Sequence, residues 1–117
     1  MKIEIQSFPK RKCENFKLVT FVKTGRNNLE MRKLVREMTL FDIQPYFIIG
    51  TGPGSVEDEQ TENGDLIVGN FPDIYENLPL KTMLGYQFAN DECKDIKYFF
   101  YQGMFLFCTY NILLTVL

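Results

Sequence analysis

Hydrophobic and polar residues alternate along this chain in blocks, and the blocks predict buried strands separated by amphipathic helices. Four short runs are rich in β-branched and aromatic residues and are bounded by turn residues. Continuous apolar runs of this kind are typical of strands that are buried on both faces. The predicted strands span residues 16–22, 46–50, 65–68 and 96–101, with Pro45 expected to break the pattern before the second of them.

Two segments between these strands carry apolar residues three and four positions apart, which predicts one apolar stripe on each of two helices. The helices are predicted over residues 28–40 and 78–91, and Pro79 falls in a first turn, where proline is tolerated. The stripes consist of Met31, Leu34, Val35 and Met38 in the first helix and Leu80, Met83, Leu84 and Phe88 in the second. Four of these residues are expected to be almost fully buried: Leu34, Val35, Leu84 and Phe88.

The order of the elements predicts the fold class. Strands and helices follow one another as β-α-β-β-α-β, with a loop or short helix between the second and third strands. Strands that alternate with helices form right-handed crossovers and a parallel sheet. The sequence therefore predicts an α/β half-domain of nucleotide-binding character over residues 16–102. Residues 1–15 are polar and are expected to form a frayed leader, which does not resemble a signal peptide because it has no apolar run.

Composition excludes several classes of function. The chain has 117 residues, and its 13 Lys and Arg against 15 Asp and Glu give a net charge of −2. Nucleic acid is therefore not expected as a partner, because phosphate binding needs clustered cations. Histidine is absent, which removes the commonest general base and transition-metal ligand. The three cysteines, Cys13, Cys93 and Cys108, lack the spacing of a structural zinc site.

A group of cations at the end of the first predicted strand is the main candidate site. The strand leads to Lys23 and Thr24, Arg26 lies in the turn, and Arg32 and Arg36 share one helix face at i and i+4. Open parallel sheets bind ligands beyond the carboxyl ends of their strands, where these cations would meet a nucleotide diphosphate. Spacing alone favours the simpler interpretation, a solvated polar helix face.

Two other polar groups have simpler interpretations. The glycines in Gly50-Thr-Gly52-Pro-Gly54 match no phosphate-binding motif, and acidic residues follow at once, so a plain turn is expected. A second constellation surrounds the third predicted strand and consists of Asp65, Asp73, Tyr75, Asn77 and Lys81. Most of its members are expected to be caps and turn formers, and Lys81 is expected to form a modest surface pair with a carboxylate.

Three runs carry a family resemblance: FKLVTFVKTGRNNLEMRKLVRE, YFIIGT, and DEQTENGDLIVGNFPDIYENLPLKTMLGYQFANDECKDIKYFFYQ. Their N…R…R helix, GDLIVG…F-D-Y-NL-LKT block and C-x-x-x-x-KY motif resemble the β-1,3-galactosyltransferase family over about residues 13–102. Members are Golgi membrane glycosyltransferases of the Rossmann-like GT-A type, related to the fringe enzymes.

The resemblance implies a hexosyltransferase that uses Mn²⁺, a UDP-galactose or UDP-N-acetylhexosamine donor and a glycan acceptor. The donor nucleotide would be bound by Lys23, Thr24, Arg26, Arg32, Arg36, Asp65 and Lys81.

Departures from the family pattern argue against activity. In the family, a D-x-D motif that holds Mn²⁺ follows the strand matching KYFFYQ, but here Gln102 is followed by Gly103-Met104-Phe105 and by no acidic residue. Carboxylates are the ligands that Mn²⁺ prefers, so no metal is expected to bind. The usual membrane anchor and the acceptor-binding half are also missing. We therefore expect a truncated and inactive fragment, with two alternatives: a non-catalytic nucleotide- or partner-binding module, or an enzyme completed by a second chain.

The last residues form an apolar tail over 103–117 that is expected to lie outside the family pattern. No charged residue occurs between Tyr98 and Leu117. This tail is expected to pack on the sheet, to associate with a membrane, or to be a disordered, aggregating end.

Two cysteines have positions that allow a disulfide. Cys13 and Cys93 each lie a few residues before a predicted strand, and hence at the same edge of a parallel sheet. In a doubly wound order the first and fourth strands are neighbours, so a Cys13–Cys93 bond is possible if the Cα atoms lie within about 7 Å.

Overall fold

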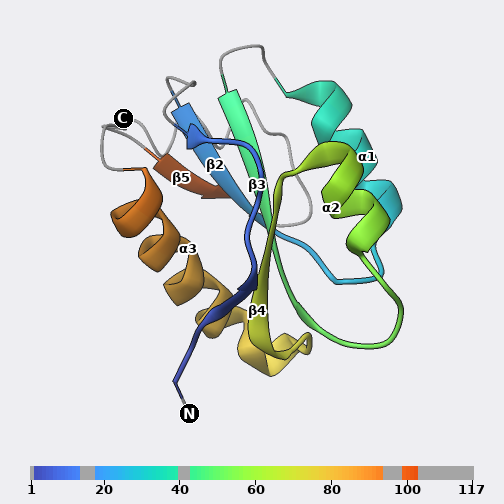
Figure 1. Ribbon diagram of the computed structural model, residues 1–117, viewed down its shortest axis with the longest axis vertical. Coiled ribbons are helices and arrows are strands. Elements are labelled where there is room, and N and C mark those ends of the chain that lie inside the picture. The colour runs from blue at the N-terminus through green and yellow to red at the C-terminus, as the bar shows by residue number, and fades with distance from the viewer. Residues whose placement is uncertain (1, 14–17, 40–42, 94–98, 103–117) are drawn as a thin grey trace.

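An open sheet lies at the centre of the molecule, and helices cover both of its faces (Figure 1). The computed structural model describes residues 2–13, 18–39, 43–93 and 99–102. Within these residues the sheet has five strands in the order β1-β4-β3-β2-β5. The four parallel strands are β2 (Leu18–Lys23), β3 (Ile43–Thr51), β4 (Leu66–Pro72) and β5 (Phe99–Gln102). The short strand β1 (Ile5–Ser7) pairs antiparallel with β4.

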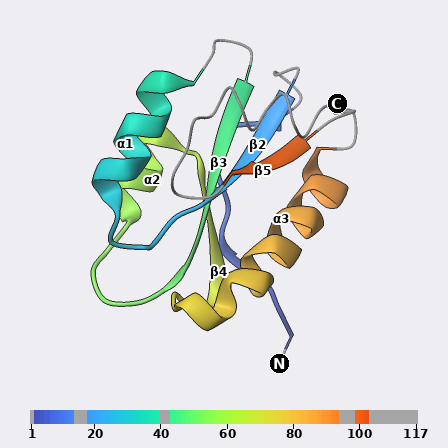
Figure 2. The same ribbon diagram turned by 180° about the vertical axis from the view of Figure 1, so that it is seen from behind.

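The helices are arranged as in a Rossmann-like α/β domain. The two helices α1 (Leu29–Met38) and α2 (Glu57–Asn63) lie together on one face of the sheet. The 3-10 turn η2 (Tyr75–Asn77) leads into α3 (Leu78–Glu92), which covers the other face, as Figure 2 shows from behind. The predicted fold class is therefore confirmed, including the neighbouring positions of β2 and β5.

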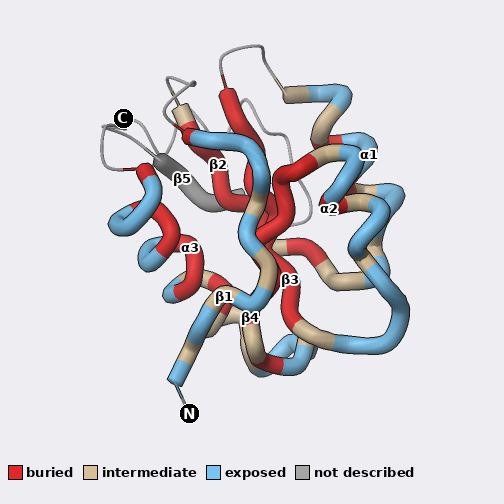
Figure 3. The backbone as a smooth tube through the Cα atoms, in the orientation of Figure 1, coloured by how far each residue is buried: buried red, intermediate tan, exposed pale blue. Residues whose placement is uncertain are grey.

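Two hydrophobic layers hold the helices on the sheet. Alternate strand residues point to opposite faces, so Phe21, Tyr46 and Ile48 pack with α3, while Phe47 and Ile49 pack with α1. These strands appear as a continuous buried centre in Figure 3. Burying one large apolar side chain contributes about 1.5–3 kcal/mol, so the two layers supply the main stabilisation of the fold.

The buried face of α1 differs from the predicted stripe. Val35 is buried as expected, but Leu34 is 49% exposed and Met38 is 52% exposed. The helix instead turns Arg32 inward, where it is 1% exposed, because ion pairs with α2 hold that face against the domain. In α3, Leu84 and Phe88 are buried as predicted, whereas Met83 is exposed.

The second predicted strand is longer than expected, because Pro45 lies inside β3 and does not end it. The amide of Phe47 donates to the carbonyl of Asp65, so odd-numbered residues of β3 turn their nitrogens toward β4. The pairing with β4 begins only at Phe47. The missing N–H of Pro45 therefore faces a position that β4 does not occupy, which is where a strand tolerates proline.

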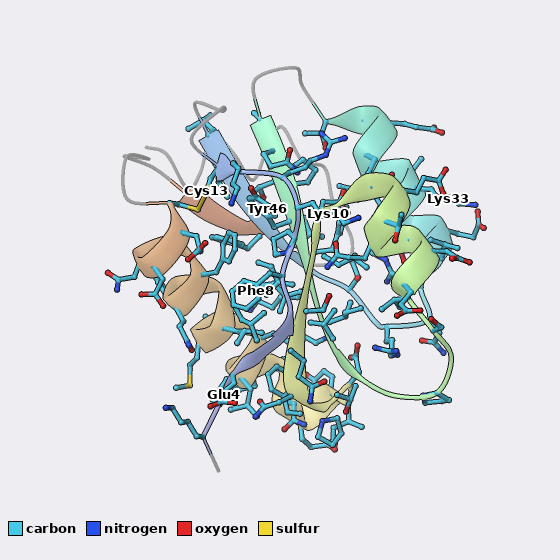
Figure 4. All side chains as sticks on the ribbon, in the orientation of Figure 1. Glu4, Phe8, Lys10, Cys13, Lys33 and Tyr46 are labelled. Carbon is cyan, nitrogen blue, oxygen red and sulfur yellow. A yellow bond between two sulfur atoms is a disulfide. The ribbon has the colours of Figure 1, made fainter. Side chains whose placement is uncertain are left out.

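The interpretation of residues 1–15 as a frayed leader is wrong for the described residues 2–13. Ile5 pairs with Gly69 in the sheet, and the amide of Arg11 donates to the carbonyl of Gly64. The hydroxyl of Tyr46 donates to the carbonyl of Arg11 at 2.8 Å, and Cys13 follows beside the end of α3 (Figure 4). This segment is therefore part of the folded domain.

The expectations for the first halves of two strands and for the tail fall on residues 14–17, 94–98 and 103–117, outside the described residues. Among the residues that the structure describes, no helix has the length and apolar character needed to cross a membrane.

Gly50 is a position where the sheet has no room for a side chain. A Cβ atom there would lie 2.5 Å from the carbonyl oxygen of Phe71 and 2.9 Å from the backbone of Asp73. We expect Gly50→Ala to lower the free energy of unfolding by about 2 kcal/mol, because overpacking against backbone forces the strands apart. Urea unfolding measures this loss. Gly25→Ala is the control, because its Cβ would meet only ordinary contacts at 3.7 Å and 3.9 Å; equal losses in both variants would contradict the expected clash.

Candidate functional site

The carboxyl ends of β2, β3 and β4 lie at one edge of the sheet. Lys23 ends β2 and Thr24 follows it, Thr51 ends β3, and Asp73 follows β4. Ligands of open parallel sheets bind beyond this edge, where loops rather than ladder hydrogen bonds surround the strand ends. Of the predicted donor-binding residues, Lys23, Thr24 and Arg26 lie here.

A buried cluster at this edge ties α3 to the three strands. The Nζ of Lys81 donates to the carbonyl of Thr24 at 2.7 Å and to Oδ1 of Asp73 at 2.8 Å. The other carboxylate oxygen of Asp73 accepts from the amide of Gly50 at 3.0 Å. Lys81 is only 2% exposed, so the expected modest surface pair is in fact a buried one, which is strongly constrained by its partners.

A second ammonium group lies beside this cluster. The Nζ of Lys23 donates to the hydroxyl of Thr82 at 2.5 Å. Burial lowers the pKa of Lys23, and the nearby charge of Lys81 lowers it further. A depressed lysine pKa means that the site disfavours its own positive charge. An added anion would relieve this, so the edge is electrostatically suited to an anionic ligand.

Arg26 holds the glycine-rich turn that follows β3. Its two terminal nitrogens donate to the carbonyls of Gly50 at 3.0 Å and Gly54 at 2.7 Å. Its Nε is buried and has no partner among the described residues. The predicted plain turn at residues 50–54 is therefore fastened by one guanidinium, and one N–H of that group remains uncommitted.

Arg32 uses every N–H of its guanidinium within the protein. Its nitrogens donate to both carboxylate oxygens of Glu59, to the hydroxyl of Thr24, and to the carbonyls of Gly25 and Arg26. The distances run from 2.7 Å to 3.1 Å. Arg32 thus fixes the turn after β2 by hydrogen bonds to residues 24–26. It is not the solvated polar residue that spacing alone allowed.

Arg36 continues the same network one helical turn later. It donates to both carboxylate oxygens of Asp65 at 2.8 Å and to Glu59 at 2.7 Å, and its guanidinium lies 4.9 Å from the ring centre of Phe47. Burial opposes charge on Arg36 and on Glu59. Hydrogen bonds across the network nevertheless raise the pKa of Arg36 and lower that of Glu59, which favours the charged forms of these two groups.

The structure therefore divides the seven predicted donor-binding residues into two groups. Lys23, Thr24, Arg26 and Lys81 gather at the carboxyl edge. Asp65 precedes β4 and lies at its amino end, so Arg36, bound to it, also lies away from that edge. Arg32, the seventh residue, connects the two groups, because it bonds both Glu59 and the turn at residues 24–26. Their assignment to donor binding stays a prediction, whereas their ion pairs are visible in the structure.

Sequence reasoning missed Glu59 as the partner of both arginines. It lies in the acidic run Glu57–Glu59, which was considered only as a deterrent to phosphate. The signal that could have revealed it is the i, i+4 pair of arginines on α1, because two cations turned toward the domain need a shared anion. Asp73 was noted only as a turn former. Over the described ranges, no group of three or more Cys, Asp or Glu residues is placed to hold a metal ion.

Known proteins similar to this chain are glycosyltransferases. The galactosyltransferase family matches residues 25–116, which extends past Gln102, where we expected the resemblance to end. The Drosophila melanogaster protein "Beta-1,3-galactosyltransferase brn" is 30% identical over 86 residues, which is 65% of this chain and 26% of that protein.

Two further relatives match shorter or similar segments. The Rattus norvegicus protein "Beta-1,3-galactosyltransferase 4" is 32% identical over 92 residues, covering 69% of this chain and 25% of the relative. The Homo sapiens protein "UDP-GalNAc:beta-1,3-N-acetylgalactosaminyltransferase 1" is 41% identical over 44 residues, covering 38% of this chain and 13% of the relative. The chain thus spans about a quarter or less of the length of these relatives.

Proposed function

Because this chain belongs to the galactosyltransferase family, we propose that its glycosyltransferase-like domain, of the GT-A type, binds the diphosphate of a UDP-hexose at the carboxyl edge of the sheet. The observation that carries this proposal is the neighbouring pair of ammonium groups on Lys23 and Lys81, of which Lys81 is paired with the carboxylate of Asp73. Burial and the charge of Lys81 lower the pKa of Lys23, and this favours an anion at this point. The sugar is proposed to be galactose or N-acetylgalactosamine, the sugars named for the relatives.

We propose further that this chain alone does not transfer the sugar. No Asp or Glu occurs after Asp95, so the segment that follows β5 has no carboxylate for Mn²⁺. The donor would then be bound without a metal to neutralise its diphosphate, and we expect a dissociation constant of about 1 mM, or about 4 kcal/mol of binding free energy. Binding of a glycan acceptor is also proposed, and its support is membership of the family alone.

Titration with UDP, followed by amide chemical shifts or calorimetry, tests the site. We expect Lys23→Gln to weaken UDP binding by about tenfold or more, because a charge-assisted hydrogen bond contributes about 1.5–3 kcal/mol. Lys33→Gln is the matched control, since Lys33 projects from α1 away from the sheet (Figure 4). Uridine without phosphates should bind more weakly than UDP.

Two results would contradict the proposal. Micromolar UDP binding that is unaffected by Lys23→Gln would place the nucleotide elsewhere. Hydrolysis of a UDP-hexose above background in the presence of Mn²⁺ would show that the chain is active.

We infer that the chain functions in an oxidising compartment, in keeping with the Golgi location expected for the family. The support is a disulfide between Cys13 and Cys93, since such bonds form and persist in secretory compartments and are rare in the cytosol. Chain purified from cells with and without a secretory signal should differ in free thiol content by two per molecule, and equal thiol content would reject this location.

A further inference from the structure

A polar cavity opens on the face of the sheet that carries α2. We call it the α2 cavity; it has a volume of about 590 Å³ and is lined by β1, the turn after β2, the loop after β3, and α2. Small-molecule sites usually have volumes of about 300–1,000 Å³, so the α2 cavity has the size of a site for one or two sugar rings. It lies on the opposite face from α3, which carries Lys81, and it reaches the carboxyl edge through Arg26 and Thr51.

Half of the polar side chains that line the cavity are uncommitted. In the described part of the chain, no hydrogen bond is made by the side chains of Gln6, Thr51, Glu57 or Thr61. Gln60 differs, because its amide bonds both backbone groups of Leu66 and the hydroxyl of Ser7. The cavity therefore has a fixed base and a rim of free hydroxyl, amide and carboxylate groups.

The charges of the lining select the kind of ligand. Arg26 and Glu57 are the charged residues that line the cavity, and their charges cancel. Asp58 adjoins Glu57 in α2, so a free anion would be repelled, while Arg26 disfavours a cation. Hydroxyl and amide groups both donate and accept hydrogen bonds, which suits a neutral ligand that also does both.

We propose that the α2 cavity binds a neutral hexose unit of a glycan. The sugar hydroxyls would replace water at Thr51, Glu57 and Thr61, and the carbon–hydrogen face of the ring would pack against Val56 and Val68, which also line the cavity. This carbohydrate site uses neither Lys23 nor Lys81, and Arg26 is the residue that it shares with the proposed donor site.

Amide chemical shifts of the full chain during titration with methyl β-galactoside test the proposal. We expect saturable shifts at residues of β1, the loop after β3 and α2, with a dissociation constant of about 1–10 mM, because a single small sugar gains little beyond the cost of its own immobilisation. Glu57→Gln and Thr61→Val should each raise that constant by about fivefold, which corresponds to the loss of one hydrogen bond. Glu62→Gln is the matched control, since Glu62 lies in the same helix and does not line the cavity.

Three results would overturn the proposal. The first is the absence of saturable shifts up to the solubility limit of the sugar. The second is a set of shifts that lies outside the cavity or is unaltered by both Glu57→Gln and Thr61→Val. The third is binding of inorganic phosphate, rather than the sugar, at these residues. A parallel titration with UDP, followed by the amide shifts of Lys23 and Lys81, tests the nucleotide site by itself. Failure of UDP binding is thereby distinguished from failure of sugar binding.

Discussion

Replacing Glu59 by glutamine should lower the free energy of unfolding by about 3 kcal/mol, since breaking a buried ion pair on one side leaves uncompensated charge. Glu59 accepts hydrogen bonds from both Arg32 and Arg36 at 2.7–2.8 Å, and its side chain is 9% exposed. Glutamine has nearly the same shape but no charge. Among the described residues, Arg36 would then keep the carboxylate of Asp65, whereas Arg32 would have no carboxylate partner.

Urea unfolding of the two forms measures this loss. Glu62→Gln, an exposed change in the same helix, should alter the free energy of unfolding by less than about 0.5 kcal/mol. A loss of similar size in both variants, or a loss near zero at Glu59, would show that the network is solvated and contributes little.

Acid should act on the same network. Burial would raise the pKa of Glu59, but the hydrogen bonds from Arg32 and Arg36 hold it below the ordinary value of 4.5. A carboxylate whose pKa is lower when folded stabilises the fold above the pKa of the unfolded chain. This stabilisation is lost as the pH falls from about 4.5 through the folded-state pKa, and Glu59→Gln should make the unfolding free energy less steep in that range.

The ion network also links stability to the candidate site. Arg32 joins Glu59 of α2 to the turn at residues 24–26, and that turn presents Lys23 and Arg26 at the carboxyl edge. Arg32 is therefore a positioning residue for the proposed donor site. All five of its N–H groups are bonded within the protein, so none is left to donate to a phosphate. Replacing Arg32 would therefore weaken UDP binding by displacing the turn at residues 24–26.

The sheet could be predicted from the sequence because its signals are local. Runs such as Phe47–Ile49 are apolar at consecutive positions, and only a strand covered on both faces buries every one of them. The alternation of strands and helices then fixed the parallel order. Strand β1 escaped prediction because Ile3 and Ile5 alternate with polar residues over too short a segment to stand out, and only β4 gives them a partner.

The candidate site was less predictable, because its partners are distant in the sequence. The spacing of Arg32 and Arg36 shows that they share a helix face, but their anions come from 23 to 29 positions away. Nothing local distinguishes Glu59 from the exposed acids beside it. The same reason explains Leu34, since an apolar stripe predicts the buried face only where no buried ion pair turns the helix.

Loss of the Cys13–Cys93 bond should be the most damaging single change, lowering the free energy of unfolding by about 4 kcal/mol. The Cα atoms lie 5.5 Å apart, within the range that we required, and the two residues are 80 positions apart in the chain. A cross-link that closes so long a loop restricts the unfolded chain strongly, and the stabilisation grows with the length of the loop. The bond also joins the segment after β1 to the end of α3, and both cysteines belong to the hydrophobic layer between the sheet and α3. Its loss should therefore loosen the packing of that layer as well.

Urea unfolding with and without a thiol reductant measures the effect. The reductant should shift the midpoint of the unmodified chain to that of the Cys13→Ala/Cys93→Ala double variant, which should itself not respond to the reductant. Cys108→Ser is the control, because it leaves both bonded cysteines in place and should keep the full response. Equal midpoints for the oxidised and reduced chain would contradict the prediction, since noncovalent packing of Cys13 against α3 would then suffice to hold the N-terminal segment.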